Sequence, residues 1–282
     1  MLLEGIETLL TLAQEGTMSK TANRLYLSQS AVSKRIAKLE QRLGKKLIEP
    51  SGRHIKLTTD ALALIDNVGP SYQEMKGLIF DQQHFQDHSI IKLACSETLV
   101  AGYLAEIIGS YFQSDPYISI TTHHTPAIIE KVQSGDATIG FCAGHLPPQH
   151  GLATQLLFCE SFTVISPQTL KQKPKALLVN DFKNPANANQ ASLLQKAAII
   201  PLMEMDSYTA AAQLALGGVA PALVPTSIVK TLNIDPAYCH HFKFLDELTR
   251  PVHLCYRHNS YRSTRIRDLI ETIAGSIPLH IN

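Results

Sequence analysis

Four polar side chains fall within about one and a half turns of a predicted helix, at a spacing that suits hydrogen bonding to base edges. They are Gln29, Ser30, Ser33 and Lys34, and they follow Ser28, which is a suitable helix N-cap. Gln can pair with the N6/N7 edge of adenine, Lys with the O6/N7 edge of guanine, and Ser with either. Recognition helices meet the major groove with their N-terminal residues. These four side chains are therefore candidates for reading a DNA sequence.

The same stretch is strongly basic. Arg35 and Lys38 lie further along the helix, where phosphates are closer than bases, and Arg53 and His54 fall at the tip of a following hairpin. The first sixty residues hold ten Lys/Arg and six Asp/Glu, a net charge of +4 in a chain whose total is +1. This uneven placement indicates a polyanion as the partner of the first module. A solvated helix face unrelated to DNA is the alternative interpretation.

The predicted elements around these residues are three helices and a hairpin. Gly16 is expected to end the first helix, Thr17 and Ser28 to cap the second and third, and Gly44 to end the third. Two short strand-like runs then flank a Pro-Ser-Gly turn, over residues 46–49 and 54–57. This order is that of a winged helix-turn-helix.

A long amphipathic helix is predicted from Thr59, taken as its N-cap, and Gly69-Pro70 is expected to kink or briefly unwind it. Its apolar stripe comprises Leu62, Ile65, Val68, Tyr72, Met75, Ile79 and Phe80. Such a helix, with no compact partner nearby in the sequence, usually pairs with a second copy of itself. The alternative is that the stripe packs into the chain's own core.

At these residues the sequence resembles the N-terminal domain of LysR-type transcriptional regulators. The motifs that match are the A-x-x-L turn (Ala22, Leu25), the S-Q-x-A-x-S run (Ser28, Gln29, Ala31, Ser33), the L-E-x-x-L-G helix end (Leu39, Glu40, Leu43, Gly44) and the R-x-x-x-L-T exit (Arg53, Leu57, Thr58). The chain departs from the family at Ser30, where Pro is common, at Lys34, where Arg is frequent, and at Ile48-Glu49-Pro50, which replaces Phe-x-Arg.

The resemblance covers the whole chain in order. It implies a winged helix-turn-helix DNA-binding domain over residues 1–58, a linker and dimerisation helix over 59–88, and an effector-binding domain over 89–282. The partners that it implies are a double-stranded operator with an interrupted palindrome, a further copy or copies of the chain in a dimer or tetramer, a small-molecule effector, and RNA polymerase.

Beyond residue 88, short apolar runs alternate with helical patterns, which predicts parallel β–α–β units and an α/β fold. The resemblance implies a periplasmic-binding-protein-like domain of two Rossmann-like lobes, joined by crossing strands near residues 162–166 and 247–252. Lobe I would hold about 90–163 and 252–282, and lobe II about 164–251. The residue pattern agrees with this division, because the last strand and helix need a sheet that began before residue 163.

Three loops follow predicted strands and begin helices, where ligands of open α/β sheets bind. The candidate effector-binding residues in these loops are Ser96, Glu97, Thr98, Thr125, Met205 and Ser207. The alternative for the hydroxyl residues is that they cap their own helices. Glu97 either favours an amine-bearing ligand or is an acid placed at a helix N-terminus, where acids are stable.

Catalytic and metal chemistry find little support in the sequence. No GxSxG, HExxH, Walker or GxGxxG signature occurs, and adjacent His residues such as His240 and His241 project apart on a strand. We therefore expect no enzymatic activity, no metal and no cofactor. An enzyme built on the two-lobed domain is a remote alternative.

The five cysteines are odd in number and form no CxxC pair, which fits a reducing cytoplasm. Cys95 and Cys142 are expected near the cleft, whereas Cys159 and Cys255 are expected to face the core. The N-terminus has no basic region before its apolar residues, and no apolar run is long enough to span a membrane.

The hypothesis drawn from these observations is a cytoplasmic regulator that binds an operator and responds to a small effector. The alternative from another class is an architectural DNA-binding oligomer whose effector cleft is vestigial. Ligand-induced stabilisation of the fold would discriminate the two.

Overall fold

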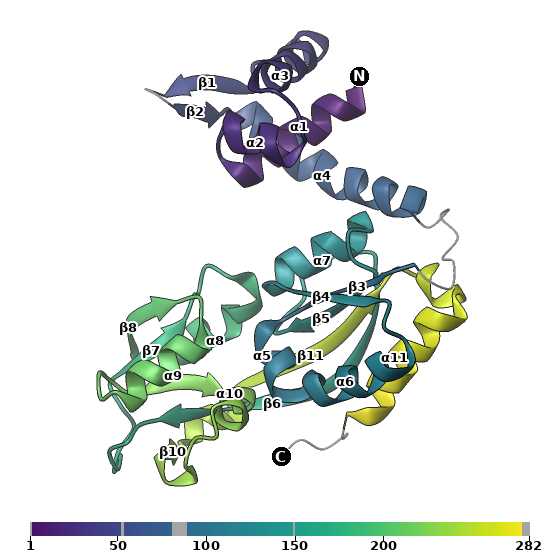
Figure 1. The fold of residues 1–282 in the computed structure, drawn as a ribbon. Coiled ribbons are helices and arrows are strands. Elements are labelled where there is room, and N and C mark those ends of the chain that lie inside the picture. Colours follow the sequence, from purple (N-terminus) through teal and green to yellow (C-terminus); the bar gives the residue numbers. More distant parts are fainter. Residues whose placement is uncertain (1, 52–53, 81–88, 149, 278–282) are drawn as a thin grey trace. The chain divides into compact units, whose positions relative to one another are not determined.

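The computed structural model describes residues 2–51, 54–80, 89–148 and 150–277 of the 282-residue chain. The chain divides into two compact units, Met1–Met75 and Lys76–Asn282, and the boundary falls inside a single long helix. Figure 1 shows the elements of both units. None of the helices in the described ranges combines the length and the apolarity that a bilayer crossing requires.

The N-terminal unit is a winged helix-turn-helix, as predicted. Its elements are α1 (Leu2–Glu15), α2 (Met18–Arg24), α3 (Gln29–Leu43), β1 (Ile48–Ser51), β2 (His54–Leu57) and the first turns of α4 (Thr59–Phe80). The predicted caps are confirmed: the Thr17 side chain accepts from Lys20 N–H and Ser28 from Ala31 N–H. Gly44 ends α3 with φ of 66°, a left-handed conformation that suits glycine.

Helix α4 packs much of its apolar surface into the core of this unit. Ala61 and Tyr72 are buried there, and Ile65, Val68 and Met75 are partly buried beside Leu9, Leu12, Ile36 and Leu39. On this face of α4 the apolar stripe therefore packs into the chain's own core, which was the alternative to pairing with a second copy. Leu62 and Ile79, predicted as stripe members, are instead exposed, because residues 61, 65, 68, 72 and 75 already form the face that meets α1 and α3.

Two local predictions for α4 concern its N-cap and Pro70, and the first of them was wrong. The N-cap is Thr58 rather than Thr59, since Thr58 Oγ1 accepts a hydrogen bond from Ala61 N–H at 3.1 Å. The helix is also unbroken from Thr59 to Phe80, so Pro70 does not unwind it. Proline removes one helical hydrogen bond and its ring crowds the preceding turn, but the packing of Tyr72 in the core helps to maintain the helix beyond it.

The larger unit is built on a mixed nine-stranded sheet with the order β4-β3-β5-β11-β6-β9-β7-β8, and β10 pairs with β6. The strands are β3 (Ile91–Cys95), β4 (Ile118–Thr122), β5 (Ile139–Ala143), β6 (Ala153–Ile165), β7 (Ala176–Asn180), β8 (Ile200–Met205), β9 (Ala222–Pro225), β10 (Cys239–His240) and β11 (Thr249–Tyr256). Strands β3, β4 and β5 run parallel, as do β7, β8 and β9, so each lobe has the predicted parallel units.

The two long strands β6 and β11 join the lobes (Figure 1). Residues 153–161 of β6 pair antiparallel with β11 in lobe I, and residues 162–165 pair with β9 in lobe II. The sequence pattern predicted only the second half of β6, because Thr154, Gln155 and Leu156 are exposed and lack the apolar run of a buried strand.

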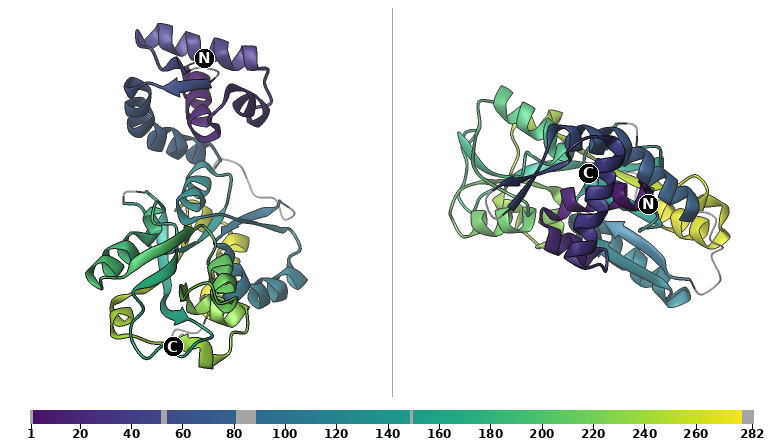
Figure 2. Two further views of the ribbon diagram at one scale, coloured as in Figure 1. Left: turned by 90° about the vertical axis from the view of Figure 1, so that its left-hand side faces the viewer. Right: turned by 90° about the horizontal axis from the view of Figure 1, so that it is seen from above.

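The helices cover the sheet at positions that the sequence predicted only in part. They are α5 (Glu97–Leu99), the π-helical turn η1 (Val100–Leu104), α6 (Ala105–Ser114), α7 (Thr125–Ser134), α8 (Ala188–Lys196), α9 (Tyr208–Leu216), α10 (Thr226–Thr231) and α11 (Thr264–Ser276). The residue pattern of 97–113 predicts one regular helix, whereas the structure interrupts it with the π-helical turn η1. The short helices α8 and α10 were not predicted. Seen from above in Figure 2, the green elements of lobe II and the yellow helix α11 lie at opposite ends of this unit.

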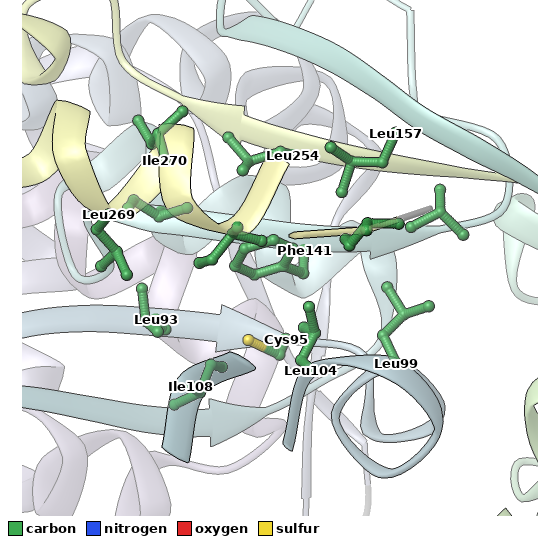
Figure 3. Close-up of a cluster of buried hydrophobic side chains, with 14 of the residues drawn as sticks. Leu93, Cys95, Leu99, Leu104, Ile108, Phe141, Leu157, Leu254, Leu269 and Ile270 are labelled. Carbon is green, nitrogen blue, oxygen red and sulfur yellow. The ribbon is translucent and has the colours of Figure 1, made fainter. Parts of the chain in front are cut away.

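Each lobe has its own hydrophobic core. Figure 3 shows the core of lobe I, where Phe141 of β5 lies among Leu93, Leu254 and Leu269. Lobe II buries a separate set that includes Val164, Leu178 and Leu223. The two cores leave β6 and β11 as the shared elements between the lobes.

The cysteine predictions were partly wrong. Cys142 does not border the cleft but is buried, with its Sγ atom 3.7 Å from that of Cys255. Cys159 is exposed rather than core-facing, because it alternates along β6 with the buried Phe158 and Glu160. Cys95 lies in the core of lobe I.

Candidate functional site

The N-terminal turns of α3 present the predicted base-reading residues to solvent. Gln29, Ser30, Ser33 and Lys34 are exposed, while Val32 and Ile36 on the other face are fully buried against the rest of the unit. Ser30 Oγ lies 2.9 Å from the Oγ of the capping Ser28, so its hydroxyl is shared with the helix cap. The fold thus holds one polar face of α3 free for a partner.

The cations of α3 differ in how they are neutralised. Lys34, Lys38 and Arg42 are exposed and have no ion-pair partner among the described residues. Arg35, predicted to contact phosphate, is half-exposed and lies 3.8 Å from Glu4 of α1. The uncompensated charge therefore follows the side of α3 that carries Lys34, Lys38 and Arg42.

The hairpin is fastened to α3 by a buried carboxylate. Glu40 Oε1 accepts hydrogen bonds from Leu47 N–H at 2.8 Å and Ile48 N–H at 3.3 Å, and Oε2 accepts from Lys46 at 3.1 Å. Burial alone would raise the pKa of Glu40, but these hydrogen bonds outweigh it and hold the pKa below its usual 4.5.

The predicted wing contacts can be placed only in part. His54 begins β2, where its backbone is opposite Ser51 in the hairpin register. Arg53 lies outside the described residues.

A second candidate site is a cavity of about 450 Å³ between the lobes of the effector unit. It is lined by Ser96, Glu97, Thr98, Thr122, His123, His124, Thr125, Ala127, Ala143, Asn180, Asn184, Asn187, Asp206, Ser207, Tyr208 and Arg250. The three loops named from the sequence do meet here. Met205 does not line the cavity, since its side chain packs against the core of lobe II.

The hydroxyl residues of the loops differ in how they are bonded. Ser96 does not cap its helix, and its Oγ lies 3.2 Å from Thr98 Oγ1 inside the cavity wall. Thr125 Oγ1 donates to Ala143 C=O and accepts from Ala143 N–H, so it fastens α7 to the end of β5. Ser207 caps α9 by accepting from Ala210 N–H. The capping alternative therefore describes Ser207, whereas Ser96 and Thr98 bond to each other in the cavity wall.

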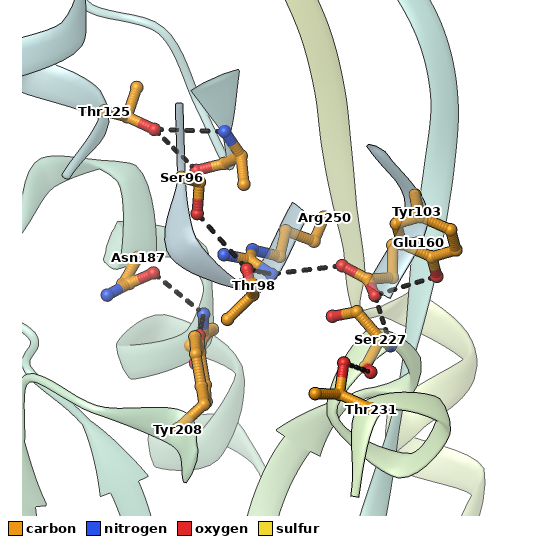
Figure 4. A network of polar contacts seen from close by, with 12 residues as sticks. Ser96, Thr98, Tyr103, Thr125, Glu160, Asn187, Tyr208, Ser227, Thr231 and Arg250 are labelled. Atoms are coloured by element: carbon orange, nitrogen blue, oxygen red, sulfur yellow. Dashed lines mark hydrogen bonds and ion pairs between the residues drawn. The ribbon is translucent and has the colours of Figure 1, made fainter. Parts of the chain in front are cut away.

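An ion pair in the cavity floor was not predicted from the sequence. Arg250 of β11 donates from Nη1 to Glu160 of β6 at 3.1 Å and to Thr98 at 3.0 Å (Figure 4). Glu160 is fully buried and Arg250 is 6% exposed. The other Glu160 oxygen accepts from Ser227 N–H at 2.6 Å and from Tyr103 OH at 3.1 Å. One carboxylate thus joins both long strands to helices of both lobes.

The lobe II wall consists of amides and one phenol. Asn187 Nδ2 donates to Asn180 Oδ1 at 2.6 Å, and Gln190 Nε2 donates to Tyr208 OH at 2.7 Å and to Asn187 Oδ1 at 3.1 Å. The Arg250 guanidinium lies over the Tyr208 ring at 5.2 Å from its centroid. An Asn-rich stretch directly after a buried strand was the sequence signal that could have pointed to this wall.

The titratable side chains that line the cavity include Glu97, His123, His124 and Asp206. Desolvation lowers the pKa of His123, and its buried Nε2 has no hydrogen-bond partner among the described residues. Within the described ranges, no three His, Cys, Asp or Glu side chains gather as metal ligands would. The cavity can bind a small polar molecule by hydrogen bonds.

A winged helix-turn-helix with an uncompensated basic face, followed by a two-lobed domain with a polar cavity, defines a ligand-binding DNA-binding regulator. Comparisons with known families agree with this class. Residues 3–62 match the family of the bacterial regulatory helix-turn-helix protein, lysR family, and residues 86–277 match the LysR substrate binding domain.

Proteins with similar sequences are transcriptional regulators. An HTH-type transcriptional regulator of Vibrio cholerae serotype O1 is 59% identical over 278 residues, covering 99% of this chain and 97% of its own length. The HTH-type regulator YxjO of Bacillus subtilis is 23% identical, covering 89% of this chain and 88% of its own. The chain belongs to the LysR family and is a DNA-binding transcriptional regulator with an effector-binding domain.

Solved structures have the same fold. A full-length OxyR variant from Pseudomonas aeruginosa is 20% identical with a TM-score of 0.60, covering 98% of this chain and 94% of its own. Full-length BenM is 23% identical with a TM-score of 0.55, covering 98% of this chain and 96% of its own.

Proposed function

We propose that this regulator binds an interrupted-palindrome operator as a dimer or tetramer and that a small molecule in the inter-lobe cavity alters this binding. The observation that supports the proposal is the cavity, because its walls come from both lobes and its floor includes Arg250 of β11, which pairs with β6. A ligand that contacts both walls would favour one lobe arrangement over another, which is the requirement for an allosteric effect.

In this proposal residues 1–58 bind DNA, and Gln29, Ser30, Ser33 and Lys34 contact base edges. Phosphate contacts fall to Arg35, Lys38, Arg53 and His54. These roles are supported by the exposure of four side chains on α3, which are Gln29, Ser33, Lys34 and Lys38. Residues 59–88 would pair with a second copy through side chains such as Leu62 and Leu78, which are about half exposed on α4. RNA polymerase is the further partner that a change in operator geometry would affect.

To test operator binding, the purified full-length protein is used to select its preferred sequences from a random duplex library. Footprinting of the selected duplexes should show two half-sites on one face of the helix, and sedimentation should show a dimer or tetramer. A monomer in solution that protects one uninterrupted half-site would contradict the proposed assembly.

The effector arm measures thermal unfolding with small carboxylates, amino acids and aromatic acids. A ligand at a hundred times its Kd should stabilise the effector domain by about 2.7 kcal/mol. The stabilisation should fall in Ser96→Ala and Thr98→Ala, and the ligand should change operator affinity or footprint. A well-folded protein that responds to none of these compounds would favour the architectural alternative.

A further inference from the structure

The charges that line the effector cavity do not balance. Arg250 is matched by Glu160 beneath it, and no Lys lines the cavity. Glu97 of lobe I and Asp206 of lobe II are both exposed at the cavity, and neither forms an ion pair with a described residue. Two exposed carboxylates, one from each lobe, therefore line the cavity without an ion-pair partner among the described residues.

The buried end of the cavity has the opposite character. Arg250 uses only Nη1 for its bonds to Glu160 and Thr98, so Nε and Nη2 have no hydrogen-bond partner among the described residues. Asn180 is buried and uses its Oδ1 to accept from Asn187, which leaves its Nδ2 as a further donor. Unmet donors at a guanidinium suit a carboxylate, which can accept two hydrogen bonds side by side.

A ligand with only one of the two charges would satisfy one end of this cavity and not the other. An anion alone would leave Glu97 and Asp206 unneutralised, and a cation alone would leave the Arg250 donors unfilled. We propose that the effector is a zwitterion of the α-amino-acid class. Its carboxylate lies at Arg250 and Asn180, and its ammonium lies between Glu97 and Asp206. This inference rests on the proposed effector response and specifies its chemistry.

The same placement gives the ligand an effect on the lobes. An ammonium that contacts both Glu97 of lobe I and Asp206 of lobe II attracts both. The carboxylate end meets Arg250, which is bonded to β6 through Glu160 and to lobe I through Thr98. A zwitterion therefore draws the lobes together across the strands that join them.

The test is a thermal-unfolding screen of the full-length protein with each standard L-amino acid. Every amino acid that stabilises the protein is compared with its 2-hydroxy acid, which lacks the ammonium, and with its amine, which lacks the carboxylate. We expect at least one amino acid to bind, and each single-charge analogue to bind at least about tenfold more weakly by calorimetric titration.

Variants assign each charge to its end of the cavity. Glu97→Gln and Asp206→Asn should reduce the ratio of the affinity for the amino acid to the affinity for its 2-hydroxy acid. Arg250→Lys should reduce the ratio of the affinity for the amino acid to the affinity for its amine. Glu106→Gln removes an exposed carboxylate of α6 outside the cavity and should leave both preferences unchanged. Arg250→Lys keeps a cation beside Glu160, and the double variant Glu160→Gln/Arg250→Gln is used if the single variant unfolds.

The outcomes separate this inference from the proposed function. A 2-hydroxy acid, dicarboxylate or sugar that binds as tightly as any amino acid overturns the zwitterion and leaves the effector response standing. Unchanged preferences in Glu97→Gln and Asp206→Asn also overturn it. A protein that no amino acid, organic acid, amine or sugar stabilises, and whose operator binding none of them alters, overturns both.

Discussion

Side chains on one helix can serve two different purposes in DNA binding, and α3 offers both. Ser33 and Lys34 lie in the N-terminal half of the helix, where we propose the base contacts, whereas Arg42 lies in its last turn. A base contact discriminates between sequences, whereas a phosphate contact contributes equally to all of them. The two groups are therefore separable by measuring affinity on two kinds of DNA.

We expect Ser33→Ala and Lys34→Ala to weaken operator binding by about 1–3 kcal/mol each and to change binding to random DNA much less. Arg42→Ala should weaken both alike and lower the salt dependence by about one counterion. Titrations on selected and scrambled duplexes over a range of salt concentrations measure both effects. Equal losses on the two duplexes for all three variants would contradict the base-reading role.

The cysteines differ in accessibility at the residue scale. Cys159 is exposed, whereas Cys95, Cys142 and Cys255 are buried, and burial raises the pKa of the Cys95 thiol to about 12. Because the thiolate is the reactive form, we expect a thiol reagent to modify Cys159 first in the native protein and the three buried thiols only on unfolding. Peptide mapping over time measures the order, and Cys159→Ser should remove the fast phase. Fast modification of Cys95 would contradict the buried lobe I core.

At the scale of elements, Glu40 joins α3 to the wing. Glu40→Ala removes the acceptor for the buried Leu47 N–H, so we expect the N-terminal unit to lose about 1–3 kcal/mol of unfolding free energy. Glu40→Gln keeps an acceptor oxygen and should lose less, while the exposed Glu49→Ala should stay within about 0.5 kcal/mol. Calorimetric unfolding of the three variants provides the comparison.

The same carboxylate gives a pH dependence with a definite sign. The folded pKa of Glu40 lies below its usual 4.5, so its contribution is fully present above pH 4.5 and is lost as the pH falls through the folded value. The difference in stability between the wild type and Glu40→Gln should therefore shrink in acid. A difference that grows as the pH falls would rule out this linkage.

The π-helical turn η1 brings lobe I against lobe II. A Cβ atom on Gly102 would lie 2.8 Å from Ser227 Cβ and 3.2 Å from Ser227 Cα, so the absence of a side chain allows η1 to approach α10. We expect Gly102→Ala to destabilise the effector domain by about 1–3 kcal/mol. Gly109→Ala is the matched control, because nothing lies within 4 Å of its added Cβ on α6.

Chemical denaturation of both glycine variants gives the comparison. Ala in an open helical position should be neutral or stabilising by up to about 1 kcal/mol. Equal stability changes for Gly102→Ala and Gly109→Ala would show that the approach of η1 to α10 does not limit the space at position 102.

At the scale of the whole molecule, two units have hydrophobic cores that share no residue. We expect calorimetry to show two transitions, with a van't Hoff enthalpy below the calorimetric enthalpy. Glu40→Ala should move only the transition of the N-terminal unit, and Gly102→Ala only that of the effector unit. A single transition that both variants shift together would contradict independent unfolding.

The sequence by itself determined the family and many of the elements. Helical spacing, caps such as Ser28 and the αL glycine at Gly44 depend on neighbours within a few residues, so they can be predicted from local pattern. Exposure of the α3 face followed from the same periodicity. The positions of the three effector loops also followed, because parallel strands end at one edge of a sheet.

Only the tertiary structure decided which distant residues meet. Glu160 and Arg250 are 90 residues apart, and Thr98 and Arg250 are 152 apart. Their contact depends on the register of β6 against β11, which contains a bulge between Val252 and His253. The packing of α4 and the exposure of Cys159 likewise depend on which face another element covers. Local sequence patterns do not identify such distant partners, because many segments could bury the same apolar face.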